Sequence, residues 1–514
     1  NLLTSYSYDP AGRLLSMSLP GNRTVSFTYS GSNIASITDS LGNVISFSYD
    51  AMGRESGRQI HDPANALRYS LGLDYDPVGN LAQLTYADSA AEQFSYDPVR
   101  NLVQATNPLG TVTAYGYDSL RRMLSQSVAG ETIATTAYDS QDNVTGVTDA
   151  RNHSTSSSYD DFGRVRSQVS PDSGSVSMEY DAAGNPIAQR NGRGQSISLS
   201  YDALNRPMSL SYSGAARAIE FSYDTVLPGR LSSIEDIESS RGFSYNSLGQ
   251  ITTESSTQGT FTATMGYGYD SATGDLNAIT YPSGAVLSLT RDQNGQISSL
   301  RFGDQVVASN ISRLGFGPVQ SLTLGNGVQA ERSYDQRYQV SRILADSADY
   351  GYSRDAAGQV TSISGIEEPN LENGLTTYAI NPENNQLTAV EGVQNYSYDA
   401  DGNLSSDGQR SYSWDALNRL VRVEENGVEL ASYGYDSQNR RIRKTANGRT
   451  VYYHYDLDNQ LLAETLADGT PLREYVYLDG EPLAVRVHEI NPGMYFYVND
   501  HLGTPQQLMN LSRE

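Results

Sequence analysis

Tyr8-Asp9-Pro10-Ala11-Gly12-Arg13-Leu14 is the first copy of a stretch that returns along the chain. It recurs as Tyr75-Asp76-Pro77-Val78-Gly79-Asn80-Leu81 and as Tyr398-Asp399-Ala400-Asp401-Gly402-Asn403-Leu404. Tyr-Asp pairs begin at positions 75, 96, 117, 138, 159, 180 and 201, a spacing of 21 residues six times in succession. A fixed period of this length is typical of a repeat architecture, so we expect one small unit copied many times.

The Asp of each copy stands where a turn begins. A type I turn favours Asp at its first position, Pro at its second and Gly at its fourth, and Asp9-Pro10-Ala11-Gly12 fills these places. The Asp carboxylate can accept a hydrogen bond from a backbone N–H two residues on. We therefore interpret the motif as structural, and we expect Asp118→Ala to lower stability without abolishing any binding. The signature residues are Tyr8, Asp9, Gly12, Tyr75, Asp76, Gly79, Tyr96, Asp97, Tyr117, Asp118, Tyr138, Asp139, Tyr159, Asp160, Gly163, Tyr180, Asp181, Gly184, Tyr201, Asp202, Tyr398, Asp399, Gly402, Trp414 and Asp415.

The residues before each Tyr alternate between apolar and polar side chains. Val25, Phe27 and Tyr29 fall on one face of the expected strand, with Ser and Thr between them. A period of two residues indicates a half-buried β-strand that the Tyr closes. A second turn, such as Asp39-Ser40-Leu41-Gly42 or Asn107-Pro108-Leu109-Gly110, separates the two strands of a repeat. The fold class is therefore all-β, with one antiparallel hairpin per repeat.

The repeats are regular to about Leu204 and degenerate over residues 269–393. In the degenerate zone Arg291-Asp292 and Arg354-Asp355 keep the turn and lose the Tyr. Residues 367–375 interrupt the pattern, which predicts a protruding loop or a cleavable site. We assign residues 1–487 to the repeat array and 488–514 to a distinct C-terminal segment. We expect that segment to fold inward or against earlier repeats, and residues 1–8 to form an edge that pairs weakly or joins another chain.

Composition excludes several classes of protein. The formal net charge is −24, much of it from one Asp per repeat, and this disfavours nucleic acid because phosphate binding needs clustered Lys and Arg. The absence of Cys excludes disulfides and cysteine metal sites. No apolar run is long enough to span a bilayer. One basic cluster is expected to pair with turn carboxylates. Its members are Arg419, Arg422, Arg440, Arg441, Arg443 and Lys444.

No set of residues points to catalysis. The five His, at 61, 153, 454, 488 and 501, include no pair at metal-ligand spacing on one strand. His501 follows Asp500, and we interpret the two as a hydrogen-bonded turn. We therefore predict no catalytic residue, no cofactor and no metal, and we expect neither hydrolase activity nor self-cleavage, because no nucleophile–base pair is present.

These residues resemble the YD repeats of bacterial Rhs proteins, toxin-complex C components, wall-associated proteins and teneurins. Fifteen Tyr-Asp copies occur, and the chain also carries a stretch similar to the signature at the end of the Rhs core. The core-end residues are Asn499, Asp500, His501, Leu502, Gly503, Thr504 and Pro505. The resemblance implies repeats wound in a spiral, barrel-like hollow shell. In bacterial members the shell encloses a C-terminal toxin that an aspartyl self-cleavage site releases, and that site and toxin would follow Glu514.

The first functional hypothesis is a non-enzymatic shell segment of a secreted or cell-surface bacterial protein. Its partner would be a polypeptide cargo, such as a C-terminal toxin, or neighbouring shell segments, and not nucleic acid. A hairpin spiral of this length is too wide to fill with its own side chains, which favours a hollow form. The alternative is an adhesive surface module that binds carbohydrate or protein through exposed aromatic rows. An enzyme is the third and least supported hypothesis.

Overall fold

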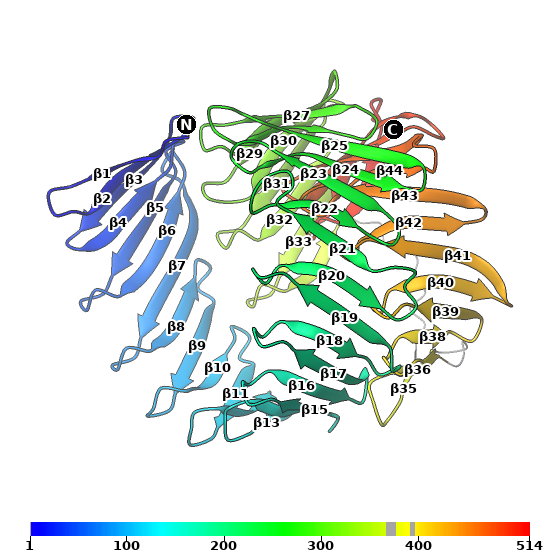
Figure 1. The fold of residues 1–514 in the computed structure, drawn as a ribbon. Helices are drawn as coiled ribbons and strands as arrows, with labels where there is room; N and C mark the ends of the chain where they lie inside the picture. The colour runs from blue at the N-terminus through cyan, green and yellow to red at the C-terminus, as the bar shows by residue number, and fades with distance from the viewer. Residues whose placement is uncertain (1, 366–376, 391–395, 514) are drawn as a thin grey trace. The chain divides into compact units, whose positions relative to one another are not determined.

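The computed structural model describes residues 2–365, 377–390 and 396–513. These residues form strands and turns, and no helix occurs among them. Consecutive strands pair antiparallel, as β1 (Ser5–Tyr8) with β2 (Leu14–Leu19) and β2 with β3 (Arg23–Ser30) do at the N-terminal end of Figure 1. The expected all-β fold of antiparallel hairpins is confirmed. The insertion predicted at 367–375 lies outside the described residues.

The chain divides into two compact units. Unit 1 comprises Asn1–Ala114, Gly266–Glu368 and Arg473–Glu514, and unit 2 comprises Tyr115–Met265 and Pro369–Leu472. Strands β11 (Val112–Tyr117), β25 (Phe261–Tyr269) and β45 (Pro471–Leu478) carry the chain from one unit to the other.

The other strands of unit 1 are β1 (Ser5–Tyr8), β2 (Leu14–Leu19), β3 (Arg23–Ser30), β4 (Asn33–Thr38), β5 (Val44–Tyr49), β6 (Glu55–His61), β7 (Leu67–Tyr75), β8 (Leu81–Tyr86), β9 (Ala91–Tyr96), β10 (Leu102–Thr106), β26 (Leu276–Thr280), β27 (Val286–Arg291), β28 (Ile297–Phe302), β29 (Gln305–Arg313), β30 (Val319–Leu324), β31 (Gln329–Tyr334), β32 (Val340–Ala345), β33 (Ala348–Arg354), β34 (Val360–Ser364), β46 (Glu481–Val487), β47 (Gly493–Asn499) and β48 (Pro505–Met509).

Those of unit 2 are β12 (Met123–Val128), β13 (Glu131–Tyr138), β14 (Val144–Asp149), β15 (Ser154–Tyr159), β16 (Val165–Ser170), β17 (Gly174–Tyr180), β18 (Pro186–Arg190), β19 (Ser196–Tyr201), β20 (Pro207–Tyr212), β21 (Ile219–Tyr223), β22 (Leu231–Glu235), β23 (Ser240–Tyr245), β24 (Ile251–Gln258), β35 (Tyr378–Ile380), β36 (Leu387–Val390), β37 (Ser397–Tyr398), β38 (Leu404–Ser406), β39 (Arg410–Trp414), β40 (Leu420–Glu425), β41 (Val428–Tyr435), β42 (Arg441–Ala446), β43 (Arg449–Tyr455) and β44 (Leu461–Leu466).

Most signature turns are three-residue hairpin loops, and those at Asp224 and Asp270 are longer. At Asp160, the Gly163 N–H donates to the Asp160 carbonyl (3.0 Å), and the Asp160 N–H donates to the Arg164 carbonyl (2.9 Å). Gly163 has φ +74°, so the loop is a type I turn followed by a left-handed residue that forms a bulge. The Asp160 carboxylate accepts from the backbone N–H groups of Phe162 and Arg164. The turn predicted from Asp and Gly is confirmed, and Tyr159 closes the strand before it.

Unit 1 has its most buried core where the C-terminal strands pack on β28 to β33. Leu300 and Val307 are fully buried there, as are Ala484 and Phe496 from the C-terminal strands. An added Cβ at Gly325 would meet the Phe496 ring, so the two elements are in contact. The Asn326 side chain also donates to the Asn510 carbonyl (3.1 Å). The expectation that the C-terminal segment folds against earlier repeats is confirmed, while β1 is exposed along its whole length.

Unit 2 has a smaller core and buried charge. Ile219, Ile234 and Phe243 form one apolar cluster. Beside it Arg241 is only 4% exposed, in a region that also buries acidic side chains. Charged groups are almost never fully buried unless they are paired, so this region is described with the site.

Candidate functional site

Three side chains link each repeat to the next, and we call this set the clasp. Arg164 donates from Nε to Asp160 Oδ2 (2.7 Å), and its guanidinium carbon lies 4.7 Å from the centre of the Tyr180 ring. The Tyr180 hydroxyl donates to the Val165 carbonyl (2.9 Å). The Arg164 side chain holds the pKa of Asp160 below its usual value. In the clasp, the Arg side chain therefore contacts both the Asp of its own turn and the Tyr ring of the following repeat.

The clasp recurs in both units. Its further copies are Asp9/Arg13/Tyr29, Asp50/Arg54/Tyr75, Asp118/Arg122/Tyr138, Asp202/Arg206/Tyr223, Asp415/Arg419/Tyr435 and Asp436/Arg440/Tyr455. Where Asn replaces Arg, as at Asn143, its amide donates to the same Asp oxygen (2.9 Å) but supplies no cation above the ring. The sequence signal for the clasp was an Arg four residues after the Asp.

The copies that lose the Tyr keep its hydrogen bond. Arg291 donates to the Leu276 carbonyl (3.0 Å) and Arg354 to the Val340 carbonyl (3.2 Å), the bond that Tyr makes elsewhere. Trp414 does the same from its indole N–H to the Leu404 carbonyl (2.8 Å). What the position requires is a long side chain with a donor at its tip. The sequence interpretation of these copies as merely degenerate missed this equivalence.

Within unit 2, turns of distant repeats interlock, and we call this contact the seam. Arg193 donates to the Asp401 carboxylate (2.6 Å), the Trp414 carbonyl (2.9 Å) and the Asn418 side chain (2.7 Å). Asp401 belongs to a signature turn, whereas Arg193 belongs to the second turn of its repeat. The seam therefore joins the two kinds of turn.

The hairpin of β35 and β36 is held at the same seam. The Asn385 side chain donates to Asp149 Oδ2 (3.0 Å), and its backbone N–H donates to Asp172 Oδ1 (2.7 Å). His153 Nε2 lies 3.0 Å from the Pro382 carbonyl oxygen. The bond from Asn385 lowers the pKa of Asp149 to about 2, and the contact with Pro382 raises the pKa of His153.

Unit 1 has equivalent contacts between second turns and signature turns. Asn294 donates to Asp39 Oδ2 (2.7 Å), and Arg337 donates to both carboxylate oxygens of Asp88 (2.6 Å each). Asp39 and Asp88 lie in second turns, and Asn294 and Arg337 in signature turns. Both units therefore build their seams by the same rule.

The third residue of a signature turn makes a contact with a distant repeat in some turns and is exposed in others. Asp401 and Gln438 hold this position in unit 2 and bind Arg193 and Arg241. Phe162 holds it in another turn and is 83% exposed. Leu120 and Leu204 are exposed in the same way.

Three arginines of the basic cluster pair with turn carboxylates, as predicted. Arg419 and Arg440 bind the turn residues Asp415 and Asp436 (both 2.7 Å), and Arg443 binds Glu238 (3.0 Å). The two other arginines use different partners: Arg422 lies 3.7 Å from Glu424, and Arg441 stacks on tyrosine rings.

A buried charge cluster connects β22–β24 to the turn at Asp436. Arg241 lies 3.5 Å from Asp236, 3.6 Å from Glu254 and 3.8 Å from Asp436. It also donates to Ser437 Oγ and Gln438 Oε1 (2.8 Å each). Burial raises the pKa of both Asp236 and Glu254. No sequence pattern had indicated this cluster, because the turn that contains Ser437 lies 196 residues after Arg241.

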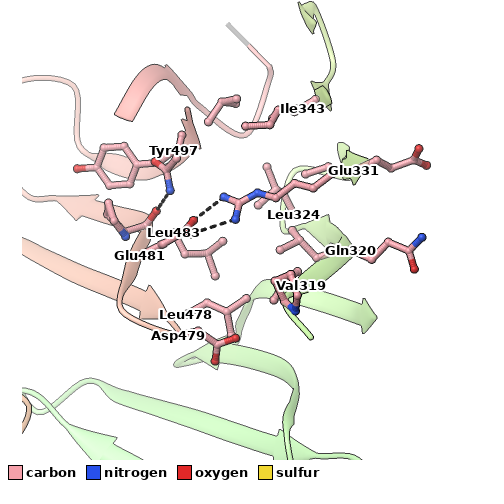
Figure 2. A pocket seen from close by; sticks show the side chains of 18 residues that line it. Val319, Gln320, Leu324, Glu331, Ile343, Leu478, Asp479, Glu481, Leu483 and Tyr497 are labelled. Carbon is pink, nitrogen blue, oxygen red and sulfur yellow. Dashed lines mark hydrogen bonds and ion pairs between the residues drawn. The ribbon is translucent and has the colours of Figure 1, made fainter. Parts of the chain in front are cut away.

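A pocket lies in unit 1 between β30–β32 and β45–β47, with a volume of about 260 Å³. Figure 2 shows Leu324 and Leu483 directed toward the same gap from the two groups of strands. Arg332 donates to both oxygens of Glu481, at 3.0 Å to Oε1. Burial alone would lower the pKa of Arg332, but Glu481 outweighs it and holds the pKa above its usual value.

The core-end signature forms the edge of this pocket and the turn beside it. Asn499 lines the pocket, and its amide donates to the Pro482 carbonyl (2.8 Å). Asp500 opens a turn in which Gly503 N–H donates to its carbonyl (3.1 Å) and Leu502 N–H to its carboxylate (2.8 Å). His501 packs on Tyr352, 4.5 Å between ring centres. The interpretation of Asp500 and His501 as a structural turn agrees with these contacts.

Neither metal nor triad geometry occurs among the described residues. They contain no group of three His, Asp, Glu or Cys that could hold a metal ion. Glu474 bonds to both Ser283 and His488 and separates them, so this set lacks the Ser–His contact of a nucleophile and its base. No helix long and apolar enough to cross a membrane occurs in the described part of the chain.

Comparison with known proteins places this geometry in a family. A family model described as the teneurin YD-shell matches residues 39–225, 173–309 and 318–514. The tRNA3(Ser)-specific nuclease WapA of Bacillus spizizenii is 25% identical over 270 residues, which are 51% of this chain and 11% of that protein. The tRNA(Glu)-specific nuclease WapA of Bacillus subtilis subsp. natto is 38% identical over 96 residues, 18% of this chain and 4% of that protein. The chain therefore spans about a tenth of these relatives or less.

Two solved structures share the fold. A Tc holotoxin pore of Photorhabdus luminescens with a TccC3 mutation matches with a TM-score of 0.76 at 16% identity, over 99% of this chain and 33% of that chain. The TcdB2-TccC3-TEV structure matches with a TM-score of 0.75 at 15% identity, over 99% of this chain and 34% of that chain. Identities this low support the fold alone. Since the family model covers most of the sequence, the chain belongs to the teneurin YD-shell family.

Proposed function

We propose that the chain is a non-enzymatic wall segment of a secreted bacterial shell protein that encloses or presents a C-terminal toxin or effector. In this proposal residues 1–487 are the repeat array and 488–514 its closing segment. The main support for this proposal is that the side chains of the signature turns hold the hairpins together. At Asp160, for example, the carboxylate accepts from two backbone N–H groups and from Arg164, which leaves it no role in acid–base chemistry.

The relatives support a shell within a larger toxin protein. Those in Bacillus are named tRNA nucleases, and the chain matches about a tenth of their length or less. The solved neighbours are parts of Tc toxin complexes. A region shared by proteins of these two kinds is better suited to housing an activity than to supplying it.

The adhesive alternative needs rows of exposed aromatic rings. The clasp works against it, because Arg164 lies over the Tyr180 ring and the Tyr180 hydroxyl is bound to Val165. An arginine guanidinium also lies over the rings of Tyr75, Tyr138 and Tyr223. A sugar would have to displace a guanidinium that is already held by a carboxylate.

A protease-protection assay tests the proposal. A protease-sensitive reporter polypeptide is fused to the C-terminal end of the chain and, as the matched control, to its N-terminal end. We expect the C-terminal reporter to survive digestion at least ten times longer than the control. Equal digestion of both fusions, together with saturable binding of the chain on a glycan array, would favour the adhesive alternative.

A further inference from the structure

The signature turns of β15 to β24, within unit 2, expose a line of apolar side chains, which we call the apolar row. Its members are the third turn residues of five consecutive hairpins, Phe162, Ala183, Leu204, Val226 and Leu248. Leu204 is 70% exposed, and the other four are exposed as well. These strands pair in sequence order, so neighbouring members of the row are about 10 Å apart, twice the spacing of paired strands.

The turns do not require apolar side chains at this position. Turn tips favour Gly, Pro, Asn, Asp and Ser, and Asp401 and Gln438 hold the same position in other signature turns of unit 2. Asp161 is the single charged residue among the second and third positions of the five turns. Neighbouring exposed apolar side chains of this kind mark an interaction site on a protein surface. The apolar row is therefore a surface suited to binding.

The seam of unit 2 shows which kind of edge fits a signature turn. Arg193 of a second turn binds Asp401 of a signature turn (2.6 Å). A Cβ added at Gly192 would collide with the Ala400 carbonyl oxygen, so the two backbones approach as closely as glycine allows. A signature turn thus packs against a second turn, through backbone as well as side chains.

Unit 2 also has a line of second turns with open space around it, which we call the open edge. It comprises Asp407-Gly408-Gln409, Asn426-Gly427 and Asn447-Gly448, in three consecutive hairpins of β38 to β43. A Cβ added at Gly427 or Gly448 would meet no atom within 4 Å in the described part of the chain, apart from the chain neighbours of that glycine. Val428, beside the middle turn, is 64% exposed, and Leu430 follows it on the same strand and is also exposed.

From these observations we propose that the apolar row binds the open edge of a second copy of the chain. Both edges are lines of antiparallel hairpins, so their turns have the same spacing and can interlock along their length. Val428 and Leu430 offer apolar surface to the row. Since the two edges differ, the contact is head-to-tail, and association continues beyond a dimer unless it closes into a ring. The inference is independent of the proposed shell function.

A symmetric contact between two apolar rows is less favourable. A specific interface buries about 800 Å² on each partner. Even a fully buried aromatic side chain contributes only about 150–250 Å², and four members of the row are smaller than Phe162. The row alone therefore falls short of a stable interface. Packing against second turns adds backbone area, as it does in the seam.

Sedimentation velocity of the full chain over a range of concentrations tests the association. We expect the weight-average sedimentation coefficient to rise with concentration. The row variant Phe162→Lys/Leu204→Lys and the edge variant Val428→Lys should each associate roughly tenfold more weakly or less. Lys at position 428 would face Glu425 on the paired strand, an arrangement that favours folding. The matched control is Gln141→Lys, at the third position of the signature turn that precedes the row, and it should associate like wild type.

Mixing the row and edge variants distinguishes a head-to-tail contact from a symmetric one. Each variant keeps one intact edge, so neither should associate alone, while the mixture should form a 1:1 complex and grow no further. An edge variant that still dimerises alone would show row-to-row pairing and overturn the proposal. A wild-type chain that stays monomeric would overturn it too, including one that instead floats with phosphatidylcholine vesicles. Leu248→Lys and Leu430→Lys provide a second pair if either variant fails to fold.

Discussion

Arg241→Met should destabilise unit 2 in a pH-dependent way. Arg241 is the centre of the buried charge cluster, facing Asp236, Glu254 and Asp436. Arg440 is the second cation there, bound to Asp436 at 2.7 Å, and Asp456 is also buried beside it. The substitution keeps most of the aliphatic volume and removes the charge and its donors.

The magnitude follows from what Arg241 contacts. Removing one partner from a buried charge pair costs about 3–5 kcal/mol. The three carboxylates lie at 3.5–3.8 Å, longer than a good charged hydrogen bond, so the low end applies. We expect a loss of about 3 kcal/mol at neutral pH. In acid, where the carboxyls are protonated, the cost of the mutation falls to about 1 kcal/mol, because only the hydrogen bonds to Ser437 and Gln438 are lost.

The sign of the pH dependence follows from the raised pKa values of Asp236 and Glu254. A carboxyl whose folded pKa is raised contributes stability that is fully present below its unfolded pKa and is lost as the pH rises through its folded pKa. The charge of Arg241 opposes this rise in both residues. Without Arg241 the folded pKa values rise further, so the cost of the mutation grows as the pH increases from about 4.

Trp414 provides the assay, because it is the single tryptophan of the chain and lies in unit 2. Urea unfolding of wild type and variant is followed by Trp414 fluorescence at about pH 4 and about pH 7.5. The difference between the two proteins at one pH cancels the titration of the turn carboxylates that they share. The control is Arg422→Met, whose partly exposed pair with Glu424 should cost under about 1 kcal/mol. An Arg241→Met effect that is equal at both pH values, or under about 1 kcal/mol at neutral pH, would refute the reasoning.

Four further predictions concern the turns, the seam and the ends. Tyr180→Phe keeps the ring under Arg164 but loses the bond to Val165, so it should cost about 1 kcal/mol in urea unfolding, and no measurable loss would contradict the clasp. Because the folded pKa of His153 is raised, its stabilisation of the β35–β36 hairpin is lost as the pH rises through that value, and His153→Gln should abolish the pH dependence of the amide protection factors at residues 378–390, which are corrected for the intrinsic effect of pH on exchange. Amides of Val498 and residues 506–508 should be protected and those of residues 5–8 should exchange fast, and the reverse order would contradict the expected order of the two ends. The purified chain should yield no defined cleavage product on a gel, and the Asp500→Asn variant should give the same result, since Asp500 holds a turn.

The turns and strands could be predicted because their causes are local. An Asp carboxylate reaches a backbone N–H two residues on, and Gly163 adopts a left-handed conformation at the fourth position. Alternating apolar residues set the face of each strand. These effects act within about ten residues, so a single sequence contains them.

The clasp was only half visible in the sequence. Arg164 and Tyr180 are 16 residues apart, as are Arg122 and Tyr138, and this recurring separation was a usable signal, although Arg54 and Tyr75 are 21 residues apart. It was missed because the Arg was regarded as one of two residues tolerated after Gly. The seams and the pocket are different, since Arg193 meets Asp401 across 208 residues and Arg332 meets Glu481 across 149. Nothing in a repeat specifies which distant copy it will face.

The two sets of carboxylates give the chain opposing responses to acid. Turn residues such as Asp160 and Asp202 have lowered pKa values, so their stabilisation is present above the unfolded pKa and is lost as the pH falls through the folded value. Asp236 and Glu254 respond in the opposite direction, because burial disfavours their charged forms and the nearby Asp436 carboxylate adds to this effect. The turn groups recur along the chain, whereas the cluster occupies one place in unit 2. Mild acid, above the lowered pKa values of the turns, should therefore strengthen the contact between β22–β24 and the Asp436 turn while the hairpins remain intact, and stronger acid should open the hairpins first.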